Sequence, residues 1–209
     1  MENIDWLGHD SFRISGSKTL YIDPWKLRGS PPPADIILVT HEHFDHLSKD
    51  DIAKLSTPGT AVVGPAEVTG QLTGETHTVT PGDTITVQGV VVTAVPAYNT
   101  SKFKSPGVLF HPPADGKVGY VVEMDGRRIY HAGDTDAIPE MAQIDVDVAL
   151  IPVSGTYVMT AEEAVEACKM LRAKVVVPMH YGVVAGTVAD AQRFKELCPL
   201  PVEILEPVA

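Results

Sequence analysis

The stretch from Thr40 to Ser48 reads T-H-E-H-F-D-H-L-S. The other candidate residues of the chain are interpreted by their relation to it. Inside this stretch, the six consecutive positions 41–46 contain four side chains that can bind a transition metal: His41, His43, Asp45 and His46. The apolar residues at 36–39 come directly before them and predict a buried strand, because the run is rich in β-branched residues and bounded by polar ones. The metal-binding side chains are therefore expected where a core strand ends and a loop begins, a usual place for a site in α/β folds.

The spacing within this stretch has a physical reason. Residues two apart in extended chain point the same way, so His41 and His43 can bind one ion together. Asp45 and His46 lie past the strand end and can turn toward a second ion. Imidazole and carboxylate groups suit zinc, iron or manganese. The alternative is a polar turn with scattered histidines, but three His and one Asp at this spacing argue against it.

Two later residues also stand at predicted strand ends. Asp134 follows Gly133, which permits a sharp turn that brings the carboxylate inward. His180 follows the apolar strand at 175–177 by three residues. Alone, these residues would be interpreted as a turn aspartate and a core histidine. Together with the 40–48 stretch, they are expected to complete a metal site.

The motif H-x-H-x-D-H at 41–46 resembles the first metal motif of the metallo-β-lactamase superfamily. The G-D-T at 133–135 and the P-M-H-Y at 178–181 are similar to the later motifs of that family, in the same order. The resemblance runs from about Gly8 to Gly182. It implies an α/β fold, the four-layer αββα sandwich. No linker or low-complexity segment interrupts the sequence, so residues 1–209 are expected to form a single domain of this type.

The resemblance also implies which residues bind metal. His41 and His43 would hold the first ion, while Asp134 would bridge two ions. The second ion would be held by Asp45, His46 and His180. The implied cofactor is one or two divalent ions, with zinc preferred and manganese or iron as alternatives.

This chain departs from the family pattern in one place. The superfamily usually has a further histidine for the first ion just before a hairpin, but residues 96–100 contain none. Tyr98 or Asn99 could replace it, His111 could reach in from the following loop, or the first ion could be weakly bound. We prefer a weakened first site at this stage, because zinc tolerates two histidines and a carboxylate with an open position.

The irregular stretch at 96–113 is long, and such loops in compact domains are usually functional. It offers Tyr98, Asn99, Lys102 and His111 for substrate binding or as a replacement ligand. His111 is also a catalytic candidate, as is Asp45, which could orient a metal-bound hydroxide as well as bind metal.

Two residues near the start are candidates for supporting the metal ligands by hydrogen bonds. Asp23 ends a short strand where the family often carries an acidic residue, although an Asp-Pro turn is an equal alternative. His9 lies in a G-H-x-S-F segment that looks similar to one in related hydrolases. Without that resemblance, a lone histidine in a turn is more often structural.

These features predict a hydrolase. Metal ions lower the pKa of bound water, so that a metal-bound hydroxide could attack an ester, lactone, amide or phosphodiester of a small molecule. The sequence resembles most the branch that contains ascorbate-6-phosphate lactonase and N-acyl-phosphatidylethanolamine phospholipase D. Two alternatives remain: a protein of this fold that binds metal or a ligand without turnover, and a nuclease or phosphodiesterase.

Composition limits the partners. The 16 basic against 27 acidic residues give a net charge of -11, which argues against nucleic acid or an anionic membrane as a partner. No apolar stretch is long enough for a membrane span, no signal segment is apparent, and Cys168 and Cys198 fit no metal or redox motif. A cytoplasmic protein is expected, and a homo-oligomer remains open.

Periodicity and turn residues predict the remaining elements. Alternating residues from 77 to 95 predict a β-meander, and Asp125-Gly126 predicts a hairpin. Further strands are expected at 4–8, 11–14, 20–22, 61–63, 146–153, 175–177 and 202–205. Helices are expected at 47–55, at 65–72, from Thr160, and from Thr187 or Asp190 to about Leu197.

Overall fold

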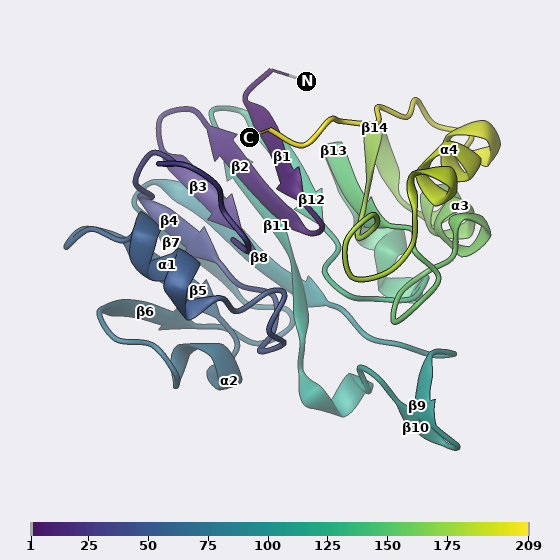
Figure 1. The fold of residues 1–209 in the computed structure, drawn as a ribbon, viewed down its shortest axis with the longest axis horizontal. Helices are drawn as coiled ribbons and strands as arrows, with labels where there is room; N and C mark the ends of the chain where they lie inside the picture. Colours follow the sequence, from purple (N-terminus) through teal and green to yellow (C-terminus); the bar gives the residue numbers. More distant parts are fainter. Residues whose placement is uncertain (1, 209) are drawn as a thin grey trace.

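The computed structural model describes residues 2–208 and shows four layers (Figure 1). Two six-stranded sheets face each other, and helices cover the outer face of each sheet. The first sheet is covered by α1 (Lys49–Leu55) and α2 (Ala66–Thr69), and the second by α3 (Ala161–Met170) and α4 (Val188–Leu197). The αββα sandwich expected from the sequence is therefore confirmed.

The first sheet keeps its strands in chain order. They are β1 (Ile4–Gly8), β2 (Ser11–Ser15), β3 (Thr19–Ile22), β4 (Ile36–Leu38), β5 (Ala61–Gly64) and β6 (Glu75–Thr78). The first three pair antiparallel, and β3 to β6 are parallel. The carboxyl end of the central strand β4 leads directly into the histidine-rich stretch.

The second sheet has the order β14-β13-β12-β11-β8-β7. Its strands are β7 (Thr84–Val87), β8 (Val90–Pro96), β11 (Val118–Met124), β12 (Arg127–His131), β13 (Asp145–Pro152) and β14 (Arg172–Met179). The three strands β12, β13 and β14 are parallel, so their carboxyl ends meet at one edge. A small hairpin, β9 (Phe103–Ser105) with β10 (Val108–Leu109), stands apart below the sandwich, and short 3-10 turns lie at Pro113–Asp115 and Pro139–Gln143 (Figure 1).

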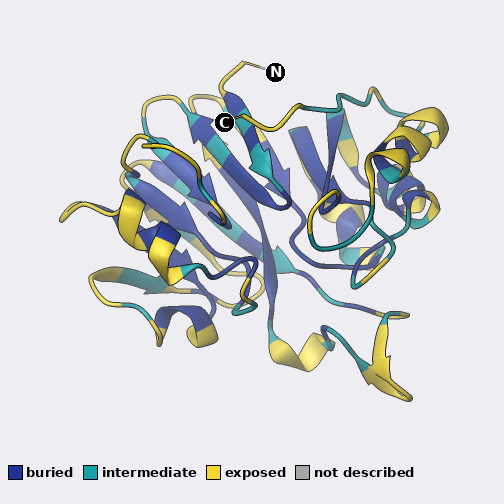
Figure 2. Ribbon diagram, viewed as in Figure 1, coloured by how far each residue is buried: buried dark blue, intermediate teal, exposed yellow. Residues whose placement is uncertain are grey.

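Strand β4 is apolar throughout because both of its faces are buried. Ile36 and Leu38 belong to the core between the sheets, whereas Ile37 and the following Val39 pack under α1. This alternation follows from the two-residue period of a strand. It explains why a continuous apolar run forms a strand here rather than a helix. Figure 2 shows the inner strands as almost wholly buried, while the helices expose one side.

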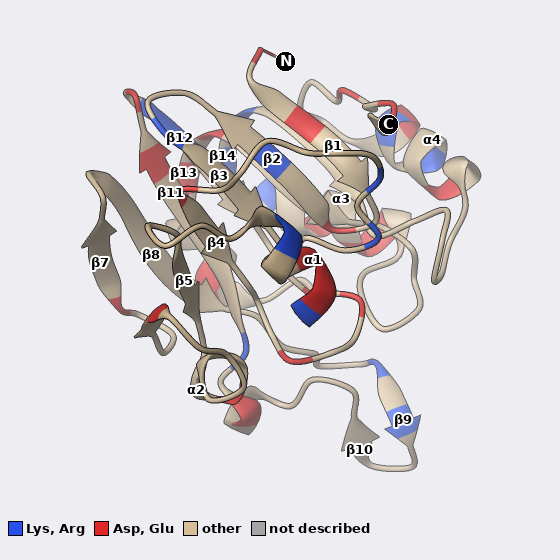
Figure 3. Cartoon of the chain, turned by 60° about the vertical axis from the view of Figure 1, so that its left-hand side comes forward, with Lys and Arg blue, Asp and Glu red and all other residues tan. Residues whose placement is uncertain are grey.

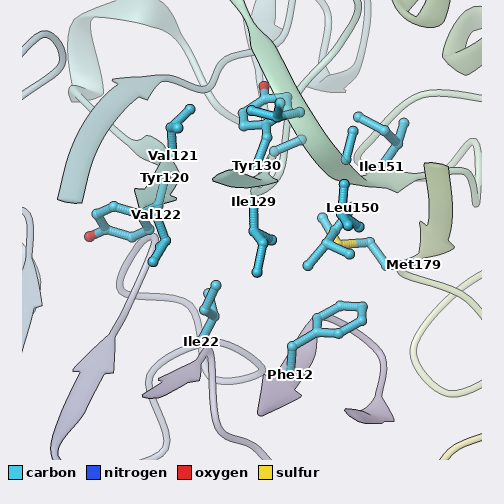
Figure 4. Close-up of a cluster of buried hydrophobic side chains, with 14 of the residues drawn as sticks. Phe12, Ile22, Tyr120, Val121, Val122, Ile129, Tyr130, Leu150, Ile151 and Met179 are labelled. Carbon is cyan, nitrogen blue, oxygen red and sulfur yellow. The ribbon is translucent and has the colours of Figure 1, made fainter. Parts of the chain in front are cut away.

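Large side chains from both sheets fill the space between them. Figure 4 shows Phe12 and Ile22 of the first sheet opposite Ile129 and Leu150 of the second. All four are at most 2% exposed. Full burial of one such side chain contributes about 2 kcal/mol. This packing fixes the two sheets against each other and so places the loops at their common edge.

The helix starts match the sequence signals. Ser48 caps α1 by accepting a hydrogen bond from the backbone of Asp51. Thr160 caps α3 in a capping box with Glu163, and the choice between Thr187 and Asp190 resolves to Thr187 as the cap of α4. Each cap satisfies backbone N–H groups that the first helical turn leaves without partners.

Three expected elements differ from the structure. The 77–95 region is no meander, because β6 pairs in parallel with β5 in the first sheet while β7 and β8 form a hairpin in the second. Alternating residues predict strands but not their partners, and here the chain crosses between sheets. The predicted last strand is reduced to a single bridge between Val202 and Val176. The helix expected at 65–72 shortens to the four residues of α2.

Charged residues of both signs occur on α1 and α4 (Figure 3). The interior strands carry few of them, as burial requires. Within residues 2–208, no helix is long and apolar enough to cross a membrane.

The two cysteines, far apart in the sequence, lie together where α3 and α4 pack. Their mutual hydrogen bond lowers the pKa of Cys198 to about 7 and, with burial, raises the pKa of Cys168. We therefore expect the rate of Cys198 alkylation by iodoacetamide to be half-maximal near pH 7 and to level off about one pH unit above it, because the thiolate is the reacting form. Mass spectrometry of the modified peptide would follow this rate. A steady rise to about pH 9, as for an ordinary thiol, would contradict the prediction.

Candidate metal centre

The chemically active side chains gather where strand ends meet. His41 follows β4, Asp134 follows β12, and His180 follows β14. The turn between β1 and β2 adds His9 and Asp10 to the same place. Gly133 has a φ of +64°, and a Cβ there would lie 2.8 Å from the carbonyl oxygen of Val118. Glycine is therefore required for the turn that brings the Asp134 carboxylate inward, as the sequence suggested.

Three histidines form the first group of donor atoms. His43 Nδ1 lies 3.0 Å from His41 Nε2 and 3.4 Å from His111 Nε2. Asp134 Oδ2 lies 3.9 Å from His41 Nε2 and 3.6 Å from His111 Nε2. Of the alternatives left open for the first ion, the structure thus places His111, from the long loop, where the missing histidine was sought.

Asn99 positions His111 rather than facing the donor group itself. The backbone N–H of Asn99 donates to the carbonyl of His111 (2.7 Å), and the backbone N–H of His111 donates to Asn99 Oδ1 (3.0 Å). The Asn99 amide also donates to the carbonyl of Tyr157 (2.8 Å) and to Asp136 (3.2 Å). Asn99 is wholly buried. It therefore ties both ends of the long loop together.

The other two candidates from this loop are engaged elsewhere. The Tyr98 hydroxyl donates to Glu140 at 3.0 Å, and Lys102 Nζ pairs with Glu163 at 2.6 Å. Lys102 also lies 3.7 Å from Asp136. The structure does not bring Tyr98 or Lys102 to the histidines, because carboxylates on neighbouring segments hold their polar ends.

A second group of donor atoms lies on the other side of Asp134. Asp134 Oδ1 is 3.4 Å from His46 Nε2 and 3.5 Å from His180 Nε2. Asp10 Oδ2 is 3.5 Å from His46 Nε2 and 3.9 Å from His180 Nε2. The two oxygens of Asp134 thus face two different sets of ring nitrogens.

Asp45 stands at the edge of the second group and is held by His9. Its Oδ2 lies 3.1 Å from His9 Nε2, and its Oδ1 lies 4.0 Å from His46 Nε2. Burial would raise the pKa of Asp45, but the hydrogen bond from His9 and the charge of His46 lower it. His9 therefore keeps Asp45 ionised and fixes its direction.

Hydrogen bonds orient the rings of the second group. Asp23 Oδ2 lies 2.7 Å from His46 Nδ1, and its Oδ1 accepts from the backbone N–H of Thr40 at 2.8 Å. Ser154 Oγ lies 2.9 Å from His180 Nδ1. Partners at Nδ1 leave the Nε2 of each ring directed into the group, which is the arrangement found around metal-binding histidines.

Burial and charge set different protonation states in the two groups. Burial lowers the pKa of His41 and His43, and it lowers that of His111 to about 4. These rings are neutral at neutral pH, so each has a lone pair to donate. In the second group burial is outweighed by Asp134 and other carboxylates, which raise the pKa of His46 and bring that of His180 to about 9. A divalent ion there would displace these protons.

The buried polar atoms test whether metal ions fit these residues. Among residues 2–208, the polar side-chain atoms that are buried without a hydrogen-bond partner are both oxygens of Asp10, Asp134 Oδ1, His46 Nε2, His180 Nε2, His9 Nδ1 and His111 Nδ1. Four of the six residues are in the second group. Such atoms are strongly unfavourable unless something satisfies them. Imidazole and carboxylate donors converging in this way fit divalent transition metals.

The backbone of the site is strained at three non-glycine residues. His9, Asp23 and His180 have positive φ values of 53°, 46° and 60°. Such conformations cost of order 1 kcal/mol or more each and persist where surrounding contacts impose them. The strain directs these three side chains toward the second group.

Two residues that the sequence analysis did not single out also belong to this region. Lys117 is buried and pairs with Glu42 at 2.9 Å, which anchors the histidine-rich loop to the start of β11. Asp10 is fully buried beside His46. The signal for Asp10 was a carboxylate directly after His9, but a turn aspartate is too common to stand out.

An aromatic pair lies beside the metal motif. Phe44 is 67% exposed and contacts Trp25 edge-on, with ring centroids 5.8 Å apart. Lys26 Nζ lies 4.1 Å from the centre of the Trp25 ring. An exposed phenylalanine between metal-binding residues offers an apolar surface to a bound molecule.

Comparison with known proteins identifies the family. A model of the family described as "Beta-lactamase superfamily domain" matches residues 3–180. A UPF0173 metal-dependent hydrolase from Methanoculleus marisnigri is 39% identical over 197 residues, which cover 92% of this chain and 86% of the relative. A protein of the same description from Thermococcus onnurineus is 34% identical over 229 residues, with coverage of 98% and 96%.

Solved structures give the same result. A crystal structure of a protein from Parabacteroides distasonis superposes with a TM-score of 0.83 at 32% identity, over 97% of this chain and 93% of that chain. Igni18, a metallo hydrolase from Ignicoccus hospitalis, superposes with a TM-score of 0.76 at 26% identity, over 99% and 95%. The chain therefore belongs to the metallo-β-lactamase superfamily and is one of its metal-dependent hydrolases.

Proposed function

We propose that the protein uses two divalent ions to hydrolyse the ester, lactone or phosphodiester bond of a small molecule. One observation carries the proposal: the oxygens of Asp134 point to two sets of ring nitrogens, with Oδ2 3.6 Å from His111 and Oδ1 3.4 Å from His46. A carboxylate placed in this way suits two ions a few ångströms apart.

Each ion would have its own protein ligands. His41, His43 and His111 would hold the first ion with Asp134 Oδ2, a donor set that suits zinc. His46 and His180 would hold the second with Asp134 Oδ1 and Asp45, a set in which manganese or iron is an alternative. Because His111 lies beside His41 and His43, we prefer two complete metal sites to a weakened first site.

The chain's own residues would then carry distinct tasks. Bound divalent ions lower the pKa of water toward neutrality and polarise the bond under attack. Asp45 would use Oδ1 both to bind metal and to orient the attacking water, because His9 occupies its Oδ2. His111, next to His43, would serve as a ligand in preference to a proton donor, because its pKa near 4 keeps it neutral.

A neighbouring cavity suggests the kind of substrate. His9 lies in the wall of a cavity of about 730 Å³, which Trp25 and Tyr181 line with aromatic surface and Lys26 and Arg28 with positive charge. A cavity of this size and lining suits a small molecule with an apolar part and a negative charge. The narrower resemblance to lactonases and phospholipases of the superfamily remains a hypothesis about the substrate.

Turnover assays would test the proposed function. Wild-type protein with Mn²⁺ or Zn²⁺ is expected to hydrolyse at least one of bis-p-nitrophenyl phosphate, p-nitrophenyl acetate and a γ-lactone, and His46→Ala is expected to abolish this activity. His77→Ala is the matched control, since His77 pairs with Glu75 on β6, outside the donor groups. Activity that survives His46→Ala unchanged would exclude the metal mechanism. Tight metal binding without turnover on any of the three would favour a binding protein.

Removing the hydrogen bond behind His46 should weaken metal binding. In Asp23→Asn the His46 ring loses the carboxylate that lies 2.7 Å from its Nδ1. The ring is then less firmly oriented, and its Nε2 is less basic. Such changes cost about 10- to 100-fold in metal affinity. Competition of the purified variant with a chromophoric chelator would measure this loss, and circular dichroism would verify the fold. Wild-type affinity in a folded Asp23→Asn would contradict the supporting role of Asp23.

A further inference from the structure

Asp10 is a buried carboxylate without a hydrogen-bond partner. Its side chain is 0% exposed, and neither oxygen has a hydrogen-bond partner within residues 2–208. Its backbone is fixed, because His131 Nε2 lies 2.9 Å from the Asp10 carbonyl oxygen. A buried carboxylate that accepts no hydrogen bond is strongly unfavourable, so the position calls for a cation.

Ring nitrogens that could donate to a metal ion lie close to the Asp10 carboxylate. Its Oδ2 lies 3.5 Å from His46 Nε2 and 3.9 Å from His180 Nε2, and both nitrogens also lack hydrogen-bond partners. Donor atoms about 2.1 Å from one common ion lie roughly 3 to 3.5 Å from each other. The separation of 3.5 Å from His46 is at the upper end of that range and the 3.9 Å from His180 is slightly beyond it, and both are too long for good direct hydrogen bonds.

The neighbouring carboxylate, Asp45, has a different environment. Its Oδ2 is taken by His9 at 3.1 Å, and its Oδ1 is 4.0 Å from His46 Nε2, farther than Asp10 Oδ2. Asp10 is thus nearer to the second group of nitrogens than the carboxylate that the motif supplies.

We propose that Asp10 is a ligand of the second metal position, together with His46, His180 and Asp134. The inference rests on the proposed function, since it assumes that the second group binds an ion. With Asp45 also nearby, the second position has two histidines and three carboxylates, which is more ligands than tetrahedral zinc takes. Such an oxygen-rich set favours manganese or iron(II) there.

The test is titration of metal-free protein with Mn²⁺ alone, with free Mn²⁺ counted by electron paramagnetic resonance. Wild-type protein is expected to bind two Mn²⁺ ions per chain. Asp10→Asn and Asp10→Ser are each expected to weaken one of the two sites at least about tenfold and to leave the other unchanged. His111→Asn should instead weaken the other site.

A matched control separates ligation from a general effect of a buried aspartate. Asp51 is 4% exposed and pairs with Ser48 and Lys54 on α1, outside the donor groups. Asp51→Asn should bind both ions as the wild type does. Thermal unfolding adds a second readout: without metal, Asp10→Asn should be at least as stable as wild type, but Mn²⁺ should raise its Tm less.

Each outcome decides between the proposals. If both Asp10 variants bind two Mn²⁺ ions with wild-type affinity, the inference is wrong and the two-metal function stands. If wild-type protein binds no Mn²⁺, Zn²⁺ or Fe²⁺, the proposed function fails and the inference with it. If both variants fail to fold without metal where wild type folds, Asp10 has a structural role instead, and the inference is again wrong.

Discussion

Replacing Asp134 by Ala should remove hydrolysis and most of the bound metal together. The carboxylate is the one group that faces both sets of nitrogens, with Oδ2 toward His41 and His111 and Oδ1 toward His46 and His180. Metal ions supply several kcal/mol of stabilisation to such reactions, so turnover should fall by at least about 100-fold. Turnover of bis-p-nitrophenyl phosphate and plasma mass spectrometry on the same preparation would measure both effects.

A control for this substitution lies on β13. Asp147 is a partly buried aspartate whose carboxylate pairs with Lys174 and accepts from the backbone of Arg128, away from the donor groups. Asp147→Ala should keep wild-type metal content and turnover. Near-normal activity in Asp134→Ala would mean that the two sets of nitrogens act without a bridging carboxylate, and the two-ion proposal would have to be abandoned.

Removing the metal should also destabilise the fold strongly. Ions present at about 1,000 times their dissociation constant stabilise the folded state by about 4 kcal/mol. For a chain of 209 residues this corresponds to a Tm shift of roughly 10 °C. Calorimetry before and after treatment with a chelator would measure the shift, and metal content before treatment would give the number of ions bound.

The loss of stability on metal removal should be reversible if the proposal is right. Adding Zn²⁺ or Mn²⁺ back should restore both the Tm and the turnover, whereas Mg²⁺ should restore little, because it prefers oxygen ligands and keeps its waters. An unchanged Tm after complete removal of metal would show that the unpaired atoms around Asp134 are tolerated without ions.

The αββα sandwich was predicted from the resemblance of the motifs, and the strands that carry them were predicted well because their signals were local. The apolar run before His41 was long enough to specify a strand buried on both faces, and the structure places it at the centre of the first sheet. Strand ends then predicted where Asp134 and His180 would lie. Parallel neighbouring strands end at one edge, so residues far apart in the sequence meet there.

What the sequence could not predict depended on long-range pairing. Nothing in an alternating pattern tells which sheet a strand joins, so the crossing between β6 and β7 was missed. His111 was one of several options because a loop has no periodicity from which to infer direction. In the structure, reciprocal hydrogen bonds with Asn99 hold the backbone of His111 in place. Asp10 was missed because its neighbours His46 and His180 follow two other strands, β4 and β14, that are distant from it in the sequence.

The reciprocal bonds between Asn99 and His111 have a consequence for how such proteins can diversify. They close the long loop at its base, so the β9–β10 hairpin beyond them is an appendage that exposes Phe103 and Val108. Changes in the length of that hairpin need not move His111. The segment is therefore a natural place for insertions in evolution, and for grafting in engineering, that alter access to the centre while keeping its metal ligands in register.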